Sequence, residues 1–197
     1  MEENLIPSPA QQPAEESLVY NLYYWLQTLV LAVCAIVLLF TFVGRITRVV
    51  GDSMLNTLHN GDLLLLQSAF YTPKAGDIVV LNKTTDETLT LLDGEAIVKR
   101  VIATEGQTVS IDYADSVVYV DGQPLDEPYI WEPMDRRTGP YSGQIPFVVP
   151  EGSVFVMGDN RNNSTDSRHE LLGPVDKGYI LGRAVFILFP FSDLGPL

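Results

Sequence analysis

The sequence predicts a mainly β protein, with a single N-terminal transmembrane helix followed by a mostly antiparallel β domain. First, the stretch from Leu22 to Val43 carries no charged residue. Second, the rest of the chain consists of short runs rich in Val, Ile and Leu separated by Gly, Asp, Asn and Pro, a pattern typical of strands and turns. Third, 197 residues with 46% hydrophobic and 19% charged residues can bury a core.

The N-terminal segment, residues 1–21, is predicted to be a disordered acidic tail. It contains four glutamates together with Pro7, Pro9 and Pro13, and it has few large apolar residues. Such a segment buries too little apolar surface to offset the entropy of ordering.

Residues 22–43 are predicted to form the transmembrane helix. At 1.5 Å per residue, about 22 residues reach roughly 33 Å, which is enough to cross the hydrocarbon core of a bilayer. Aromatic residues at one end resemble an interfacial belt, and Arg45 and Arg48 follow the other end. A cleavable signal peptide is the alternative, but the segment lacks a basic n-region and no small-x-small cleavage site follows it.

Residues 44–197 are predicted to form the β domain. Glycines lie at or near the ends of the strands, where positive φ is useful. The segment Glu127–Pro146 has four prolines and two glycines and is expected to leave the core. The predicted strands are Arg48–Val50, Leu63–Ala69, Asp77–Leu81, Ala96–Thr104, Thr108–Asp112, Val117–Val120, Ser153–Met157 and Ile180–Phe189.

The composition excludes several classes of function. A net charge of −13 with only 12 Lys and Arg argues against nucleic acid as a partner. The single cysteine, Cys34, cannot form an intramolecular disulfide. Neither His59 nor His169 has Cys, Asp or Glu at a spacing typical of zinc sites, so we expect no metal site.

Two short segments contain residues suited to nucleophilic catalysis. Ser53 lies in a Gly-Asp-Ser-Met turn about eight residues beyond the predicted span, although a serine in such a turn is usually only a turn residue. Lys99 and Arg100 interrupt an apolar strand, and alternation places them on opposite faces. A lysine that loses hydration there has a lowered pKa and can serve as a general base. The alternative is a lysine whose stem covers apolar surface while its amine reaches solvent.

A third segment, Gly158–Arg168, places eleven small or polar residues directly after an apolar strand. This is more than a turn requires, and it is typical of a hydrogen-bonded platform that supports a site. A plain surface loop is the alternative.

Taken together, ordered segments of this chain resemble the sequence boxes of bacterial type I signal peptidases, and they cover nearly everything from Val49 to Val185. Five boxes in the same order behind one anchor are far more specific than any one motif. The matching segments are Gly51–Leu58, Gly76–Val80, Val98–Val101, Val118–Gly122 with Glu127–Tyr129, and Gly158–Arg168.

The resemblance implies roles for individual residues. Ser53 would be the nucleophile, Lys99 the general base, and Ser164 a hydrogen-bond partner of the lysine amine. The backbone N–H of Ser53 would stabilise the oxyanion. Some members add a hydroxyl two residues earlier, where this chain has Gly51. The residues expected to hold the final box in shape are Asp159, Asp166 and Arg168, with Arg100 as an ion partner.

Two departures from the family pattern concern loops. Asn56 stands where the first box usually has proline, and Ala103–Gln107 replaces a Gly-x-Pro-Gly-Asp turn. Neither touches the predicted Ser53 and Lys99 pair, so they put loop geometry in doubt and leave the predicted reaction unchanged.

The resemblance also implies the substrate and the location. It predicts a serine endopeptidase that removes signal peptides from exported preproteins, needs no cofactor and acts in the cell membrane. The sequence does not give the oligomeric state, for which a monomer is our expectation. Three alternatives remain: a repressor-type Ser/Lys autoprotease, which is soluble and carries a DNA-binding domain; an endoplasmic-reticulum-type peptidase, which uses histidine in place of Lys99; and a tethered β domain that only binds a partner.

The predicted orientation and the predicted membrane contacts rest on weaker signals. Arg45 and Arg48 after the span favour a cytoplasmic β domain, whereas the resemblance requires an extracytoplasmic one. We follow the resemblance, because two arginines are a small bias. Large residues that either dip into the bilayer or fill the core are Tyr129, Ile130, Trp131, Phe189 and Phe191.

Overall fold

The computed structural model describes residues 14–42, 44–82, 96–135, 146–169 and 172–197. Helix α1 spans Ala14–Phe42, and its stretch Leu18–Leu38 is long and apolar enough to cross a membrane. The helix therefore starts eight residues before the predicted one, and residues 14–21 of the predicted tail are helical. Residues 1–13 of that tail, and Val43, lie outside the described residues.

The β domain contains one large antiparallel sheet and one small one. The large sheet has the order β1-β2-β11-β3-β4-β9-β10, with β12 paired to β11. Its strands are β1 (Gly44–Arg48), β2 (Leu63–Gln67), β3 (Ile78–Leu81), β4 (Ile97–Thr104), β9 (Ser153–Met157), β10 (Val175–Asp176), β11 (Ile180–Phe189) and β12 (Gly195–Pro196).

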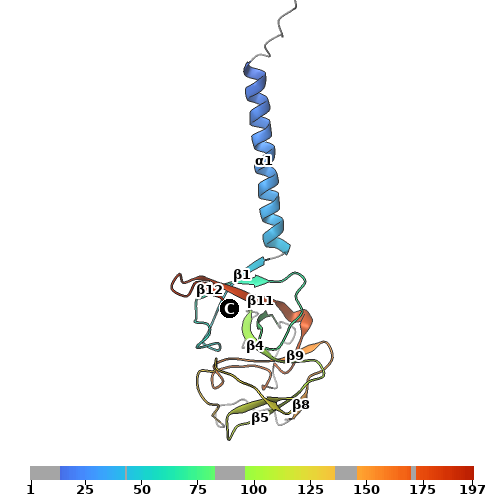
Figure 1. Cartoon of the computed structure of the whole chain (residues 1–197), viewed down its shortest axis with the longest axis vertical. Coiled ribbons are helices and arrows are strands. Elements are labelled where there is room, and N and C mark those ends of the chain that lie inside the picture. The colour runs from blue at the N-terminus through green and yellow to red at the C-terminus, as the bar shows by residue number, and fades with distance from the viewer. Residues whose placement is uncertain (1–13, 43, 83–95, 136–145, 170–171) are drawn as a thin grey trace, which may run out of the picture. The chain divides into compact units, whose positions relative to one another are not determined.

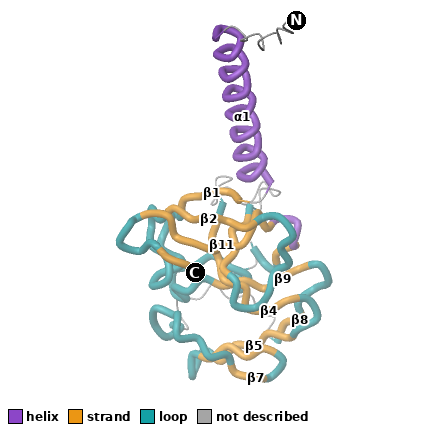
Figure 2. Tube along the Cα trace, turned by 45° about the horizontal axis from the view of Figure 1, so that its top comes forward, coloured by secondary structure: helices purple, strands orange, loops and turns teal. Residues whose placement is uncertain are grey.

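The small sheet has the order β7-β6-β5-β8. It lies at the opposite end of the β domain from β1 and β2 (Figures 1 and 2). Strand β4 runs on from the large sheet through a short turn into β5 of the small sheet. The strands of the small sheet are β5 (Thr108–Asp112), β6 (Val117–Val120), β7 (Gln123–Pro124) and β8 (Phe147–Val148).

The predicted antiparallel β architecture is confirmed, and most predicted strands match observed ones. The first is displaced: β1 ends at Arg48, where the predicted strand began. Val49 is still hydrogen-bonded to the backbone of Gly61 and Asp62, but these two residues precede β2. The two-residue strands and the 3-10 helix η2 (Lys177–Tyr179) are too short to give a periodic signal. Residues 127–135 contain no strand, as predicted for that part of Glu127–Pro146, whereas 136–145 lie outside the described residues.

The centre of the large sheet is buried on both faces. All four residues of β3 are buried: Ile78 and Val80 pack in one cluster with Met54 and Leu58, and the two others pack in a second cluster with β9. A third cluster joins β4 and β9 to the small sheet. Because β4 lies between β3 and β9, a polar side chain on β4 enters a region with little access to water.

Candidate active site

The turn that carries Ser53 is fixed at both ends. Gly51 begins it with φ +86°, a conformation that strains any residue with a Cβ, and its N–H donates to Asn60 Oδ1 at 3.2 Å. Met54 and Leu58 follow Ser53 and are fully buried in the core. The turn therefore holds the Ser53 hydroxyl in place through packing on one side and a hydrogen bond on the other.

Lys99 lies on β4 and is only 3% exposed. Its Nζ donates to Ser53 Oγ at 2.8 Å and to the Val98 carbonyl at 3.0 Å. Among the described residues, no carboxylate forms an ion pair with this amine. The two residues singled out from the sequence therefore meet, although they are 46 positions apart.

The surroundings of Lys99 favour its neutral form. Burial lowers the pKa of the amine to about 8, because the charged form loses its hydration. Asp166 and Asp159 act in the opposite direction through their negative charge, and Arg168 adds to the lowering. An amine with this pKa that accepts a proton from a neighbouring hydroxyl has the properties of a general base.

Asn160 holds the Ser53 turn from the opposite side. Its backbone N–H donates to the Ser53 carbonyl at 3.0 Å, and its side-chain Nδ2 donates to the Asp52 carbonyl at 3.1 Å. Gly158 lies against the same turn: a Cβ there would be 2.5 Å from the Ser53 carbonyl oxygen and would collide with the side chain of Ser164. Only glycine lets the Gly158–Arg168 segment approach the turn this closely.

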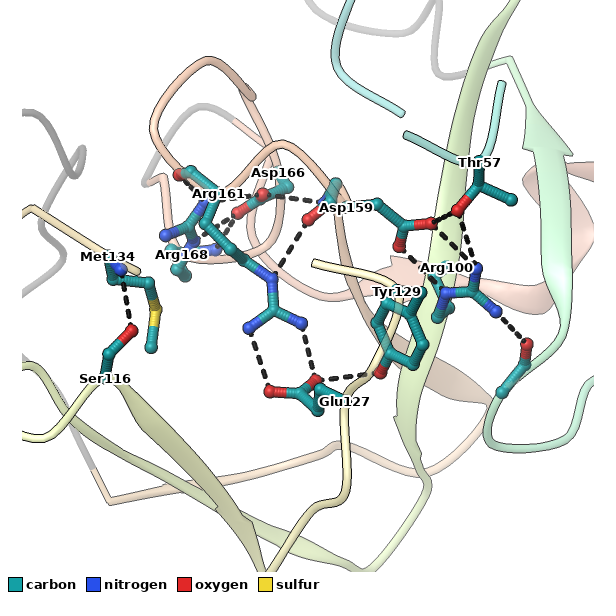
Figure 3. A network of polar contacts seen from close by, with 12 residues as sticks. Thr57, Arg100, Ser116, Glu127, Tyr129, Met134, Asp159, Arg161, Asp166 and Arg168 are labelled. Atoms are coloured by element: carbon teal, nitrogen blue, oxygen red, sulfur yellow. Dashed lines mark hydrogen bonds and ion pairs between the residues drawn. The ribbon is translucent and has the colours of Figure 1, made fainter. Parts of the chain in front are cut away.

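Arg100, the neighbour of Lys99, is also mostly buried, with only 11% of its side chain exposed. It makes a bidentate pair with Asp159, with Nε–Oδ1 at 2.8 Å and Nη2–Oδ2 at 2.7 Å. Asp159 in turn accepts the hydroxyl of Thr57, which lies in the Ser53 turn (Figure 3). The predicted ion partner of Arg100 is therefore Asp159, and the pair ties β4 to the Gly158–Arg168 segment.

Asp166 and Arg168 form a second buried pair inside the same segment. The Nε and Nη2 of Arg168 donate to the two carboxylate oxygens of Asp166 at 2.9 Å each, and Asp166 also accepts the N–H of Gly158 at 3.0 Å. These two parallel hydrogen bonds fix the shape of the Gly158–Arg168 segment, which the sequence predicted to be a hydrogen-bonded platform.

Ser164 differs from the expectation. Its hydroxyl is buried near Gly158 and Asp166 but makes no hydrogen bond to Lys99, whose donors go to Ser53 and Val98. The Ser164 side chain contributes to the lowered pKa of Asp166, without the geometry of a full hydrogen bond. The resemblance missed this because the lysine amine donates instead to the backbone carbonyl of Val98.

His59 is closer to carboxylates than its sequence spacing indicated. The ligand atoms of His59, Asp62 and Asp193 lie within 4.8 Å of one another, because the fold brings the segment after β11 beside the turn after Leu58. However, Asp62 accepts the backbone N–H of His59 at 2.8 Å, so the position of its carboxylate is explained by turn formation.

Other residues of the site were not singled out from the sequence. Four of them lie within the matching segments, but no periodic or compositional signal separates them from ordinary turn residues: Asn160, Thr57, Glu127 and Arg161. Tyr129 was considered only as a membrane or core residue. It is half-buried, and its ring packs against Arg100 instead (Figure 3).

Comparison with known proteins shows to which family the chain belongs. The family model described as "Signal peptidase, peptidase S26" matches residues 22–189. The chain is 41% identical to "Probable signal peptidase I-1" of Synechocystis sp., over 100% of this chain and 93% of that protein. It is 36% identical to signal peptidase I of Leptolyngbya laminosa, covering 97% and 89% of the two chains.

More distant relatives show the same match. Signal peptidase I of Bacillus licheniformis is 34% identical over 88% of this chain and 92% of that protein. These similarities extend over nearly the whole chain, including α1 and both sheets. The chain therefore belongs to the signal peptidase I family, peptidase S26, a family of serine endopeptidases.

Proposed function

We propose that this protein is a membrane-anchored endopeptidase that removes N-terminal signal peptides from exported preproteins, with Ser53 as nucleophile and Lys99 as general base. The observation that carries the proposal is the 2.8 Å hydrogen bond from a buried lysine amine to a serine hydroxyl, with no carboxylate paired to that amine among the described residues. A lysine held for structure alone would be expected to have a carboxylate partner or to reach water.

The reaction follows from these positions. Neutral Lys99 takes the proton of Ser53 as Oγ attacks the scissile carbonyl carbon, and the ammonium then protonates the leaving amine. Water hydrolyses the acyl-enzyme, and Lys99 again accepts the proton. The N–H of Ser53 makes no hydrogen bond to described residues, so it is available to an oxyanion. Gly51 offers no second hydroxyl donor.

The substrate is expected to bind in an extended conformation. Strand β1 pairs with β2 along one edge, and no described strand pairs with its other edge. The chain reaches Ser53 five residues after the end of β1. An extended peptide could add to such an edge through backbone hydrogen bonds. By resemblance to the family, we expect small residues at positions −1 and −3 from the cut.

The membrane location is proposed from α1. A single apolar helix before the domain would keep the enzyme at the surface where its membrane-held substrates lie, which raises their effective concentration. The proposed orientation places the N-terminus in the cytoplasm and the β domain outside. The protein is expected to act as a monomer.

The alternatives are less well supported. A histidine-based peptidase of the endoplasmic-reticulum type does not fit Lys99 beside Ser53. A soluble repressor-type autoprotease does not fit the apolar helix. A domain that only binds a partner does not need a buried lysine whose pKa is lowered to about 8.

The test of the reaction is substitution of each member of the pair. Ser53→Ala and Lys99→Ala are each expected to lower kcat/KM on a preprotein by at least about 10³-fold while the fold persists, because the two residues act as one unit. Cleavage is followed by gel, and folding by circular dichroism. Turnover by either variant within tenfold of the unmodified enzyme would rule out the assignment.

The test of orientation uses a single thiol. Cys34→Ala removes the native cysteine, and Glu151→Cys places one on an exposed residue before β9. A membrane-impermeant thiol reagent is expected to label intact cells as strongly as lysed cells. Labelling that requires lysis would place the domain in the cytoplasm, where it could not meet exported substrates.

A further inference from the structure

The segment Glu127–Trp131 has no role in the proposed reaction, yet it contacts the residues that hold the Ser53 turn. Asn160 makes two hydrogen bonds to the carbonyls of Asp52 and Ser53, so the position of Ser53 depends on where Asn160 is held. Asn160 is flanked by Asp159 and Arg161, and each of these flanking side chains is anchored by a separate ion pair.

The first anchor is the Arg100–Asp159 pair and the second is the Arg161–Glu127 pair. Arg161 is fully buried, and its guanidinium donates through Nη1 and Nη2 to the two carboxylate oxygens of Glu127, while its Nε donates to the Gly158 carbonyl at 3.1 Å. A fully buried arginine is stable only when its charge is paired, so the Glu127 carboxylate is needed to keep Arg161 in place.

Tyr129 joins the two anchors. Its hydroxyl donates to Glu127 Oε1 at 2.8 Å, and the Cζ of Arg100 lies 3.9 Å from the centroid of its ring (Figure 3). A guanidinium over an aromatic face at this distance gains a cation–π interaction. The same side chain therefore contacts the acceptor of one ion pair and the donor of the other.

The backbone of the segment adds a third contact. The N–H of Trp131 donates to the carbonyl of Asp159 at 3.3 Å. Three residues of Glu127–Trp131 thus reach the stretch Asp159–Arg161 or its partner Arg100, by an ion pair, a ring contact and a backbone hydrogen bond. We name the side chains of Glu127, Tyr129 and Arg161 the outer brace.

We propose that the outer brace positions the nucleophile, and that Tyr129 is a positioning residue for the reaction of Ser53. With the brace intact, Asp159 and Arg161 are fixed, and Asn160 holds the Asp52 and Ser53 carbonyls. Loss of the Tyr129 side chain removes the ring contact of Arg100 and the hydrogen bond to Glu127, and the Ser53 turn then shifts relative to Lys99. This inference rests on the proposed function of Ser53 and Lys99.

Loss of the outer brace is expected to lower kcat and to leave KM nearly unchanged. None of the brace contacts described above involves β1, so binding of an extended substrate is expected to be unchanged, whereas a displacement of Ser53 by about 1 Å lowers the rate about 10- to 100-fold. The pH profile gives a further sign. If Arg100 neutralises Asp159 less completely, the negative charge of Asp159 acts more strongly on Lys99, and the acidic limb of activity moves to higher pH.

The test compares Tyr129→Leu with Tyr119→Leu in the full chain, purified in detergent. Tyr119 is a partly exposed tyrosine on β6 and serves as the matched control. The readouts are kcat and KM on a synthetic preprotein with alanine at −1 and −3, and amide hydrogen exchange of residues 52–58. Tyr129→Leu is expected to lower kcat about 10- to 100-fold, leave KM within twofold, and speed exchange in 52–58, whereas Tyr119→Leu changes none of these.

Two outcomes would overturn the proposal. One is a kcat within twofold of the unmodified enzyme, and the other is a lower kcat with unchanged exchange in 52–58. If Tyr129→Leu does not fold, Tyr129→Phe decides: it keeps the ring and loses the bond to Glu127, so a smaller but measurable fall in kcat with faster exchange is expected. No change in Tyr129→Phe would then refute the brace.

Hydrogen exchange separates this inference from the proposed function. If Ser53→Ala remained active, the proposed function would fail, yet exchange of residues 52–58 in the Tyr129 variants would still report whether the brace holds the turn. If Ser53→Ala is inactive and exchange is unchanged in both Tyr129 variants, only the brace is refuted.

Discussion

Lys99 and Arg168 are both cations buried in one β domain, and their surroundings act in opposite directions. Burial lowers the pKa of Lys99 to about 8, because no carboxylate pairs with its amine among the described residues. Burial alone would also lower the pKa of Arg168, but the adjacent Asp166 carboxylate raises it above its usual value. Both cations lie in a region of low dielectric constant, and the presence or absence of a carboxylate partner determines whether the charged or the neutral form is favoured.

The difference separates a chemical role from a scaffolding role. Arg168 remains charged and fixes the Gly158–Arg168 segment through two hydrogen bonds to Asp166. Lys99 is held instead by uncharged oxygens of Ser53 and Val98, so it can lose its proton without leaving a buried carboxylate unpaired. In this site, ion pairs provide rigidity, and the absence of one at Lys99 suits it to the proposed role of a base.

The largest expected effect comes from replacing each cation by methionine. Arg168→Met leaves the fully buried Asp166 without its partner and is expected to destabilise the fold by about 3–5 kcal/mol. Lys99→Met removes a buried amine and is expected to stabilise the fold by about 1–3 kcal/mol at pH 7. Urea unfolding of the full chain in detergent, followed by circular dichroism, measures both.

The stabilisation expected for Lys99→Met changes with pH in a definite direction. The folded pKa of Lys99 is about 8 and the unfolded value is 10.5, so the unfolded state binds more protons between these values, and stability rises with pH there. The advantage of Lys99→Met is therefore complete below about pH 8 and disappears as the pH approaches 10.5. Equal changes in the free energy of unfolding for Arg168→Met and Lys99→Met would contradict the difference drawn between a paired and an unpaired buried cation.

A smaller effect is expected where the two regions meet, at Gly158. An alanine Cβ would lie 2.5 Å from the Ser53 carbonyl oxygen, so the platform and the Ser53 turn must separate. Gly158→Ala is expected to lower kcat about 100-fold, since a displacement of this kind misaligns the attacking oxygen. Gly195→Ala, whose Cβ would meet its nearest atom at 3.9 Å, is the matched control and should retain full activity.

Assays of kcat and KM on a preprotein check this prediction. A Gly158→Ala enzyme with activity within threefold of the unmodified one would show that the close approach is not needed. Equal losses in both glycine variants would point to a general effect on folding.

The sequence predicted much of the fold because its strands are long apolar runs with clear ends. Leu63–Gln67, Ile78–Leu81 and Ser153–Met157 lie within or match predicted strands. The short strands β7, β8, β10 and β12 were missed, since two residues show no alternation. The start of α1 at Ala14 was missed because polar composition was read as disorder, whereas the apolar helix continues backward into polar residues.

The candidate site was predicted less completely than the fold. Ser53, Lys99 and an ion pair between Arg100 and the final box could be proposed from matching boxes. The structure brings Ser53 and Lys99 together and shows that Arg100 pairs with Asp159. The hydrogen bonds of Asn160 and the ring contact of Tyr129 could not, because they depend on how distant loops meet. The expected Ser164–Lys99 bond was wrong for the same reason: a residue type fixes which bonds are possible, but the loop conformation determines which are made.

The smallest expected effect concerns pH and tests the Lys99 environment without any substitution. If neutral Lys99 is the base, kcat/KM follows the fraction of amine without a proton, which is about one half at pH 8 and about 1% at pH 6. Activity on a preprotein should therefore fall about 50-fold between pH 8 and pH 6, at constant ionic strength. Folding, monitored by circular dichroism over the same range, should persist, since the Asp166 carboxylate paired with Arg168 has a pKa below its usual value. An acidic limb near pH 10, as for a lysine in water, or a flat profile from pH 6 to 9, would show that Lys99 is not the group whose proton limits the reaction.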